Sequence, residues 1–312
     1  MKRISAVIST SRDDRAAQLT YVLITPARNE EAHIEATITS VVAQTIRPVK
    51  WVIVSDGSTD RTDEIVKRYT AAHDWIELVR MPERTERHFA GKVHAFNSGL
   101  ARVGDSKSDL IGNLDGDVSF EADYFEYLLG RFARNPRLGL AGTNYWEDGS
   151  VRYDYRFTSI EDVSGACHLF RRQCFEAIGG YKPIRRGGID LVAVLSARML
   201  GWETRTFTER YLVHYRPQGT ASANTWSRCF HDGQDDFVFG NHPLWEIFRA
   251  AYRLTKRPFI VNGCFVLGGY LWAMVRRLER PVSEDLVRFR RREQMVRLKR
   301  WLATLRVPRD RR

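Results

Sequence analysis

Through residue 145 the chain alternates short apolar runs with segments whose apolar residues recur at helical spacing. The short runs are rich in Val, Ile and Leu, which favours β-strands at 20–25, 49–55, 75–79 and 109–114. The segments between them predict helices around Ile34, Ile38, Val41 and Val42, around Ile65, Val66 and Tyr69, and from His88 to Arg102. Strands that alternate with helices predict βαβ units, and so an α/β fold with a mainly parallel sheet and helices on both faces.

Polar segments follow three of these strands, at 26–30, 56–60 and 115–117. The carboxyl ends of parallel strands meet at one edge of a sheet, and ligands bind there in open α/β sheets. We therefore expect these three loops to converge on one site. Asn29 is also predicted to cap the helix after the first loop, and Ser58 or Thr59 the helix after the second.

The pattern changes in the second half of the chain. Strand-like and helix-like segments mix at 163–207, with a helix predicted from Asp190 to Met199. After Asn224 the spacing is helical, and a further helix is predicted from Leu244 to Leu254. These features divide the chain into an N-terminal extension (1–19), a main domain (20–222) and a helical C-terminal extension (223–312).

Residues 259–275 carry no charge over seventeen positions, which is close to the lower limit for a membrane span. Asn262 and three glycines weaken a spanning assignment. A single span would also separate the Arg-rich tail from a cytosolic main domain, against the positive-inside rule. We therefore expect this segment to lie at a membrane surface or to pack on partners.

The net charge of +11 is concentrated at the end of the chain. Residues 276–312 hold fourteen Arg or Lys and five Asp or Glu, a surplus of nine, so the remainder is close to balanced. Such a tail suits an anionic membrane surface, although a solvated helical face would have the same composition. The balanced remainder has no basic stripe with interleaved aromatic residues, so nucleic-acid binding is not expected.

The four cysteines, Cys167, Cys174, Cys229 and Cys264, show no CxxC pair and no zinc-site spacing. This usage is typical of reduced, mostly buried thiols in a cytosolic protein. The first three residues precede only a short apolar run, too little for a secretory signal. We expect a cytoplasmic chain that is peripheral on the inner face of the cell membrane.

The strongest chemical feature is Asn113-Leu114-Asp115-Gly116-Asp117, directly after an apolar strand. Two carboxylates one residue apart can approach a single hard cation, and Gly116 lets the backbone come close to a ligand. Mg²⁺ or Mn²⁺ bound in this way takes its other ligands from water and substrate phosphates. The same residues also suit a plain surface turn, but their place at the end of a central strand favours the cation.

Four further residues are candidates for ligand contacts or catalysis. Asp56 can accept hydrogen bonds from a nucleobase imide or a ribose, and Lys92 can bind diphosphate oxygens. Asp190, at the start of a helix after two glycines, can deprotonate an acceptor hydroxyl, and His214 suits a third metal ligand. Each has a structural alternative: a cap and turn, a solvated lysine, a helix-dipole acid and a buried histidine, respectively.

Together these motifs resemble those of the family-two glycosyltransferases, which share the A-type nucleotide-diphospho-sugar transferase fold. Six stretches match in the family's order: TPARNEE at 25–31, VSDGSTD at 54–60, GK with AFNSGL at 91–100, DGD at 115–117, SGA with FRR and IGGY at 164–181, and Asp190 with Arg198 before Gly201-Trp202. They cover residues 20 to 216. The region after Asn224 is similar to a bacterial polysaccharide-associated subgroup.

The resemblance implies a nucleotide-sugar donor site. Its uridine or other nucleoside would be surrounded by Pro26, Ala27, Arg28, Glu30 and Asp56. Lys92 would lie near the donor, and Asp115 would contact the ribose and the metal. The cofactor would be Mn²⁺ or Mg²⁺, with Asp117 as its main ligand and His214 as a further one.

The resemblance also implies the reaction. Asp190 would be the base of a single in-line displacement that inverts the anomeric carbon, giving a β-linkage from an α-linked donor. The family often has a Glu-Asp pair where this chain has Ile189-Asp190. Processive members carry a Gln-x-x-Arg-Trp motif that this chain lacks, which favours the addition of one sugar to a carbohydrate or lipid-linked acceptor.

Two other classes of protein compete with this interpretation. A nucleotidyltransferase would use a similar sheet and cation, but it is expected to have a Gly-rich phosphate loop where this chain has PARNEE at 26–31. A non-catalytic module that binds membranes or polyanions through the basic tail leaves the converging carboxylates unexplained.

Overall fold

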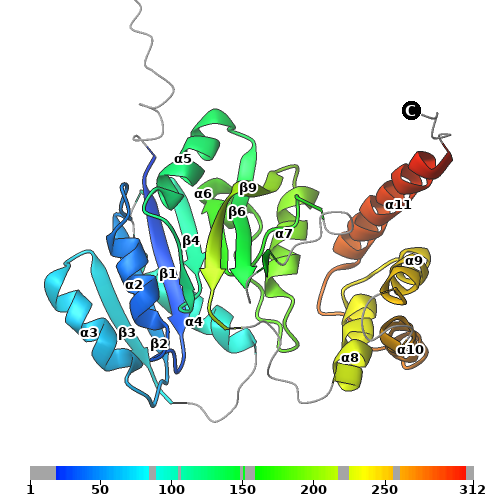
Figure 1. Cartoon of the computed structure of the whole chain (residues 1–312), viewed down its shortest axis with the longest axis horizontal. Helices are drawn as coiled ribbons and strands as arrows, with labels where there is room; N and C mark the ends of the chain where they lie inside the picture. Colours follow the sequence, from blue (N-terminus) through cyan, green and yellow to red (C-terminus); the bar gives the residue numbers. More distant parts are fainter. Residues whose placement is uncertain are drawn as a thin grey trace, which may run out of the picture. The chain divides into compact units, whose positions relative to one another are not determined.

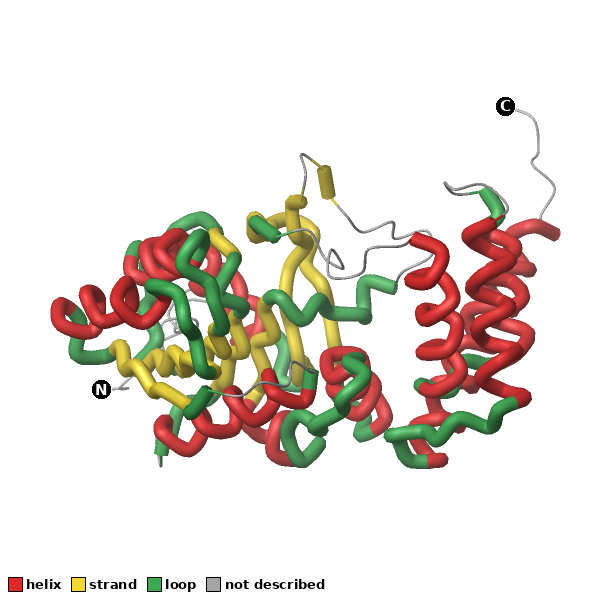
Figure 2. Tube along the Cα trace, turned by 90° about the horizontal axis from the view of Figure 1, so that it is seen from below, coloured by secondary structure: helices red, strands yellow, loops and turns green. Residues whose placement is uncertain are grey.

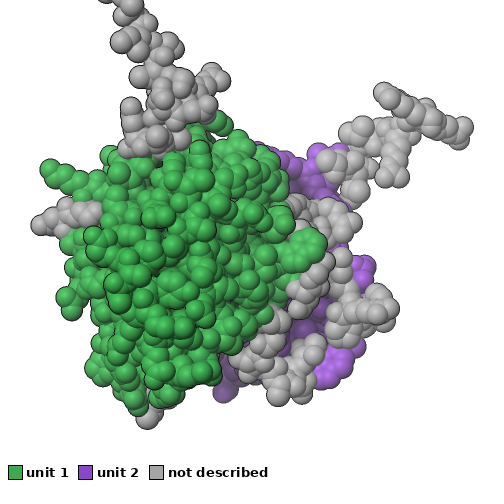
Figure 3. Space-filling model, turned by 60° about the vertical axis from the view of Figure 1, so that its left-hand side comes forward, with its two compact units in different colours: residues 1–217 green, residues 218–312 purple. Residues whose placement is uncertain are grey.

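The computed structural model describes residues 19–83, 89–104, 107–147, 150–151, 159–216, 225–255 and 261–306. The chain forms two compact units, residues 1–217 and 218–312, which have separate colours in Figure 3. Apart from Leu19, the predicted N-terminal extension lies outside the described residues. Its boundary with the main domain therefore stays a prediction.

The first unit is built on a single sheet (Figure 1). Within the described ranges the strand order is β3-β2-β1-β4-β8-β6-β9-β5, with β7 paired to β6. The strands are β1 (Tyr21–Ala27), β2 (Lys50–Asp56), β3 (Ile76–Met81), β4 (Leu110–Leu114), β5 (Val118–Ser119), β6 (Leu138–Glu147), β7 (Ser150–Val151), β8 (Cys167–Arg171) and β9 (Glu203–His214).

The sheet has a parallel half and a mixed half. β3, β2, β1 and β4 are mutually parallel, and these are the four strands that the alternating pattern predicts, each within two residues of its expected bounds. β8 then pairs antiparallel with both β4 and β6, whereas β6 and β9 are parallel. The predicted α/β fold class is confirmed, and the antiparallel pairs lie in the half where the sequence pattern was mixed.

Helices cover both faces of the parallel half. They belong to the set α2 (Ile34–Val42), α3 (Thr62–Ala72), α4 (Ala90–Val103), α5 (Tyr124–Arg134), α6 (Arg172–Ala177) and α7 (Ile189–Met199). Successive strand residues point to opposite faces. Leu23 therefore packs in the core cluster that contains Ile34 of α2, whereas Ile24 and Val54 face α4 at Gly99. A Cβ on Gly99 would lie 2.6 Å from Ile24 Cγ2, so glycine lets α4 approach the sheet closely.

The second unit, as far as it is described, consists of α8 (Thr225–Val238), α9 (Pro243–Arg253), α10 (Val261–Val275) and α11 (Glu284–Arg306), drawn as red tubes in Figure 2. The helices predicted after Asn224 and from Leu244 to Leu254 are confirmed as α8 and α9. Residues 261–275 of the uncharged segment form α10, whereas residues 259 and 260 lie outside the described residues. His88, the predicted start of the helix observed as α4, also lies outside them. Among the helices of the described chain, none has the length and apolar character needed to cross a membrane.

Candidate active site

The three polar loops start from neighbouring strands. β1 lies between β2 and β4, and Ala27 pairs with Ser55 near the carboxyl ends of β1 and β2. Neighbouring strands are about 4.8 Å apart. The loops after Ala27, Asp56 and Leu114 therefore begin side by side at one edge of the sheet, as expected from parallel order.

Hydrogen bonds tie the first loop to the second. The Asn29 side-chain oxygen accepts from the Thr59 backbone N–H at 2.9 Å, and the Asn29 N–H donates to Ser58 Oγ at 3.1 Å. The Glu30 N–H donates to Thr62 Oγ1 at 2.8 Å. These bonds fix the path of the chain from β1 into α2.

The prediction that Asn29, Ser58 and Thr59 cap the following helices is wrong, because these residues hydrogen-bond between the two loops instead. The residues at the N-cap positions of α2 and α3 are His33 and Arg61, and neither side chain makes a capping hydrogen bond. Asn29 has a φ of 55°, a left-handed conformation that Asn adopts more readily than most residues. Its side chain therefore turns to the neighbouring loop instead of the helix.

Asp115, Asp117 and His214 each bring a possible ligand atom within 4.8 Å of the others. Asp115 directly follows β4, and its backbone N–H donates to the Ala166 carbonyl at 3.0 Å. His214 ends β9 and reaches this loop because β9 pairs antiparallel with β5, where Val118 lies opposite His214. His214 Nε2 lies 3.7 Å from Asp117 Oδ1.

These three side chains suit a divalent cation. Carboxylate oxygens bind Mg²⁺ and Mn²⁺, and imidazole is an accepted ligand of transition metals. Asp117 and His214 are buried, and His214 Nδ1 has no hydrogen-bond partner among the residues that the structure describes. A Cβ on Gly116 would lie 3.4 Å from Glu30 Cγ, so glycine gives the loop room between the two aspartates. The donor set therefore fits Mn²⁺ or Mg²⁺.

Lys92, in the first turn of α4, offsets part of the acidic charge. Its Nζ lies 2.6 Å from Asp115 Oδ1. Burial opposes the charged form, but Asp115, Asp190 and Asp117 together raise the pKa of Lys92. Burial raises the pKa of Asp115 to about 6, against the lowering effect of Lys92. Lys92 is thus protonated at neutral pH and reduces the repulsion among the carboxylates.

Arg216 is a charged residue of the site that the sequence analysis missed. Its guanidinium donates two hydrogen bonds to the Glu30 carboxylate, at 2.6 and 3.1 Å. Burial, followed by the Asp117 charge, raises the pKa of Glu30 to about 7, and Arg216 opposes this shift. The available signal in the sequence was the place of Arg216 two residues after His214.

Asp190 lies near Lys92 and Asp115. It lies in the first turn of α7, after Gly188 in a left-handed conformation. Its carboxylate packs on Gly165, where a Cβ would lie 2.1 Å from Asp190 Oδ2. Its charge acts on Lys92 and on Asp115. Asp190 Oδ1 is buried and accepts no hydrogen bond from any described residue, so its hydrogen-bonding capacity is unused.

The remaining residues expected at the site lie along the ends of β1 and β2. Pro26 and Ala27 complete β1, Arg28 follows them, and Asp56 is the buried last residue of β2. The charged and imidazole groups that the structure brings together are Glu30, Lys92, Asp115, Asp117, Asp190, His214 and Arg216. Three side chains that can hold one cation, a lysine and a separate carboxylate suit the displacement of a diphosphate by a deprotonated hydroxyl.

The chain has relatives of known function. Over 196 residues it is 26% identical to 4,4'-diaponeurosporenoate glycosyltransferase of Staphylococcus aureus, a match that covers 56% of this chain and 50% of that protein. The chain thus spans about half the length of the curated relatives it matches.

Solved structures share the fold. S. aureus TarS 1–349 in complex with UDP-GlcNAc is 12% identical, with a TM-score of 0.54 over 81% of this chain and 72% of that chain. The mannosyltransferase PcManGT from Pyrobaculum calidifontis, in complex with GDP-Man and Mn²⁺, is 17% identical, with a TM-score of 0.53 over 94% and 86%. At these identities the likeness shows the A-type glycosyltransferase fold alone.

The family model described as glycosyl transferase family 2 matches residues 22–187. This stretch contains the three loops of the sheet edge, Lys92 and Gly165. It is more than half of the 312 residues, and the chain therefore belongs to the family-two glycosyltransferases.

Proposed function

We propose that this chain transfers a sugar from a nucleotide-diphosphate sugar, a UDP-sugar, to an acceptor hydroxyl in a metal-dependent, inverting reaction. The cluster of Asp115, Asp117 and His214 carries the proposal, because it lies at the sheet edge where nucleotides bind in α/β folds. Asp117 and His214 would hold Mn²⁺ or Mg²⁺, and Asp115 would contact both the ion and the ribose. A cation bound there would offset the negative charge on the leaving diphosphate.

The donor nucleoside is assigned to the ends of β1 and β2. The residues around it would be Pro26, Ala27, Arg28, Glu30 and Asp56, with Lys92 near the diphosphate. The TarS complex contains UDP-GlcNAc and the PcManGT complex contains GDP-Man and Mn²⁺. Both support a nucleotide-sugar donor for this chain, and family membership favours sugar transfer over nucleotidyl transfer.

Asp190 is the proposed base. It takes the proton of the acceptor hydroxyl, and the oxygen attacks the anomeric carbon from the face opposite the diphosphate. A bond forms between this oxygen and the anomeric carbon while the bond to the phosphate oxygen breaks, and the nucleoside diphosphate leaves. Because there is one displacement, an α-linked donor gives a β-linked product. The chain lacks the Gln-x-x-Arg-Trp motif, so one sugar is added per acceptor.

The acceptor is proposed to be a carbohydrate or a lipid-linked sugar of polysaccharide or glycolipid synthesis, met at the inner face of the cell membrane. The surplus of nine positive charges at 276–312 supports an anionic membrane surface as partner. Within it, α11 holds eight Arg or Lys and three Asp or Glu. A basic residue near such a surface contributes about 1 kcal/mol of attraction.

Donor hydrolysis by the purified chain tests the reaction class. UDP-sugars are incubated with Mn²⁺, Mg²⁺ or EDTA, and thermal shifts are recorded with UDP-, GDP- and CDP-sugars. We expect hydrolysis to require a divalent cation, to stop with EDTA, and to be matched by a higher Tm with UDP-sugar and Mn²⁺. Hydrolysis in EDTA would exclude the metal role, and no response to any nucleotide sugar would exclude the donor assignment.

Lys92→Gln separates cation binding from catalysis. The change leaves Asp115 without its lysine partner, so Mn²⁺ should bind at least as tightly as to the wild type, as measured by calorimetry. Transfer should fall about 10²-fold, because a positive charge beside the leaving diphosphate is lost. Lys92→Arg should recover part of the activity, and the exposed Lys182→Gln should behave as wild type. Weaker Mn²⁺ binding together with normal transfer would contradict this role.

Gly165→Ala tests the position of Asp190 without changing its chemistry. The new methyl group would lie 2.1 Å from Asp190 Oδ2 and must displace the carboxylate. We expect donor binding to be unchanged and kcat for transfer to fall about 10²-fold, a typical effect of misplacing a catalytic group by about 1 Å. Gly268→Ala is the matched control, because its nearest neighbouring atom would be 4.0 Å from the new methyl group. Unchanged transfer by Gly165→Ala would show that Asp190 is not constrained by this contact.

A further inference from the structure

α9 is an amphipathic helix that turns its polar face toward the other helices and its apolar face outward. Its charged residues lie inside the unit: Glu246 is fully buried, and Arg249 forms an ion pair with Asp236 of α8. On the outside, Leu244 and Ile247 are 55% and 54% exposed. A helix at an aqueous surface has the opposite arrangement.

The buried polar groups of α9 are joined to the neighbouring helices. Asn241 donates to Glu246 at 2.8 Å, and Gln294 of α11 donates to Asn241 at 2.5 Å. Arg253 pairs with Asp232 of α8 at 3.0 Å. The bonds that join Glu246, Asn241 and Gln294 are buried and favour the orientation in which this polar side of α9 faces inward. The polar contacts therefore favour an outward position of the apolar side of α9.

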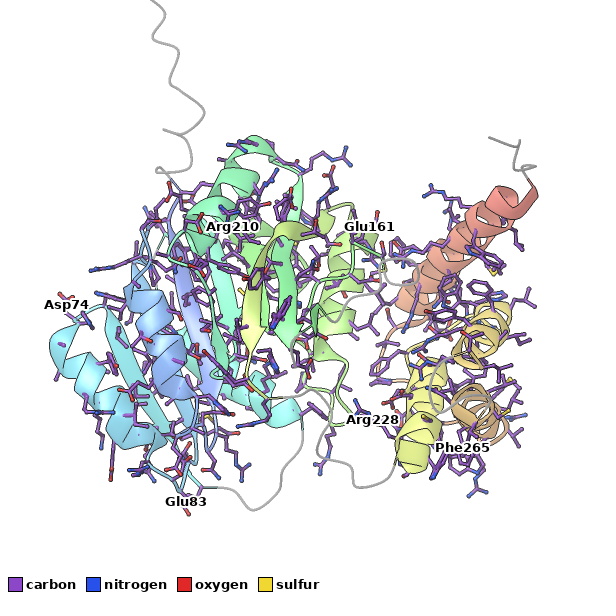
Figure 4. All side chains as sticks on the ribbon, viewed as in Figure 1. Asp74, Glu83, Glu161, Arg210, Arg228 and Phe265 are labelled. Carbon is purple, nitrogen blue, oxygen red and sulfur yellow. The ribbon has the colours of Figure 1, made fainter. Side chains whose placement is uncertain are left out.

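α10 also has an apolar outer side. Cys264, Phe265, Leu271, Trp272 and Val275 recur at helical spacing, are uncharged, and are all exposed, with Val275 at 76%. Phe265 is labelled in Figure 4. The stripe continues onto α8, whose Trp226 and Phe230 contact Phe265 and Trp272, with ring centroids 5.6 and 6.0 Å apart.

Contacts between α10 and its neighbouring helices also form away from its outer side. α8 and α10 meet through glycines: a Cβ on Gly233 would lie 1.9 Å from the Val266 carbonyl oxygen, and one on Gly269 would lie 1.9 Å from the Phe230 carbonyl oxygen. α9 meets α10 at Gly263, where a Cβ would lie 2.4 Å from the Ala250 carbonyl oxygen. The backbones are thus already in close contact, and the apolar surface of α10 that stays exposed, largest at Val275, is left for another partner.

We propose that these outward stripes insert into the headgroup–acyl boundary of an anionic membrane. The apolar docking residues are Leu244 and Ile247 on α9 and Phe265, Leu271, Trp272 and Val275 on α10. Arg276 and Arg277 directly follow α10, and the Arg276 guanidinium lies 5.7 Å from the Trp272 ring. A tryptophan with arginines at the edge of an apolar stripe is typical of helices in the membrane interface. The adjacent positive charge matches anionic headgroups, which favours a membrane over a second protein.

This inference deepens the membrane partnership proposed above and rests on it. Charge alone would give binding that salt reverses, whereas an inserted apolar face gives binding that persists in salt. Flotation of the full chain with vesicles distinguishes salt-reversible from salt-resistant membrane binding and does not depend on transferase activity. The vesicles contain phosphatidylcholine with or without phosphatidylglycerol, at low and at high NaCl.

The exposed Cys264 gives a second readout. Cys167, Cys174 and Cys229 are buried, so an environment-sensitive maleimide dye should label Cys264 selectively. We expect a blue shift of the dye on phosphatidylglycerol vesicles and flotation that persists at high NaCl. The double variant Leu271→Glu, Val275→Glu should lose both, with at least about tenfold less vesicle-bound protein.

Val49→Glu in the first unit is the matched control, since Val49 is 50% exposed and Leu271 is 45% exposed. Circular dichroism and Tm check that each variant folds, and Ile247→Glu on α9 replaces the double variant if it does not. Flotation that high NaCl abolishes, with no dye shift, would overturn apolar insertion and leave the electrostatic partnership standing. Dimerisation in solution that Leu271→Glu, Val275→Glu abolishes, without flotation, would assign the face to a second copy of the chain. Neither flotation nor dimerisation would overturn both membrane proposals.

Discussion

Asp117→Ala is expected to remove metal-dependent donor binding and to lower sugar transfer about 10³-fold. Asp117 and His214 are the buried members of the cluster, and Asp115 is already bound to Lys92. Without Asp117 the proposed cation would lose its main carboxylate ligand, and the charge on the leaving diphosphate would no longer be offset, an effect of several kcal/mol on the barrier. Calorimetry with Mn²⁺ and thermal shift with UDP-sugar and Mn²⁺ measure binding, and product formation measures transfer.

The control for this variant is Asp74→Ala. Asp74 is an exposed residue before β3 and is labelled in Figure 4. The Asp74→Ala variant should bind Mn²⁺ and transfer sugar as the wild type does. The metal assignment would fail if Asp117→Ala retained a Mn²⁺-dependent shift in Tm with donor.

Asp190→Asn is expected to bind donor as the wild type does and to lose transfer about 10³-fold. The amide has almost the same shape as the carboxylate, so the contact with Gly165 is kept. It cannot take a proton from the acceptor hydroxyl, and general base catalysis contributes about 10²- to 10⁴-fold to a rate. Donor affinity by thermal shift and product formation with acceptor separate the two effects.

Comparison with Gly165→Ala sharpens this test. Gly165→Ala moves the base and Asp190→Asn removes its basicity, so both should spare donor binding. The variant with the displaced base should retain more activity. Full transfer by Asp190→Asn would exclude the proposed base and point to another proton acceptor.

Much of the candidate site was predictable because its residues lie close to local sequence features. Asp56, Asp115 and Asp117 follow apolar runs, and the carboxyl ends of parallel strands share one edge of a sheet. Lys92 and Asp190 lie in the first turns of helices whose periodicity is visible in the chain. His214 was a candidate by its residue type, with a buried structural histidine as the alternative, and the resemblance favoured the ligand role, since its spacing from Asp117 carries no local pattern.

Other features depend on pairings between segments far apart in the chain. Arg216 binds Glu30, which is 186 positions away in the sequence. The periodicity of hydrophobic residues cannot predict such a contact. Asn29 and Ser58 have the composition of helix caps, but the two loops lie close enough for these residues to bond to each other instead. The antiparallel pairing of β4 with β8 also joins distant segments and was not predicted.

The amino-acid sequence by itself determined the α/β class, the parallel half of the sheet and the acidic loop after β4, because periodicity and strand ends are local properties of the chain. The tertiary structure alone decided which distant groups surround that loop and which side of α9 faces inward. The hydrophobic pattern identifies the two faces of an amphipathic helix, but its neighbours determine which face is buried. On α9 the buried bond of Glu246 to Asn241 and the partly buried ion pairs of Arg249 and Arg253 favour the inward polar side.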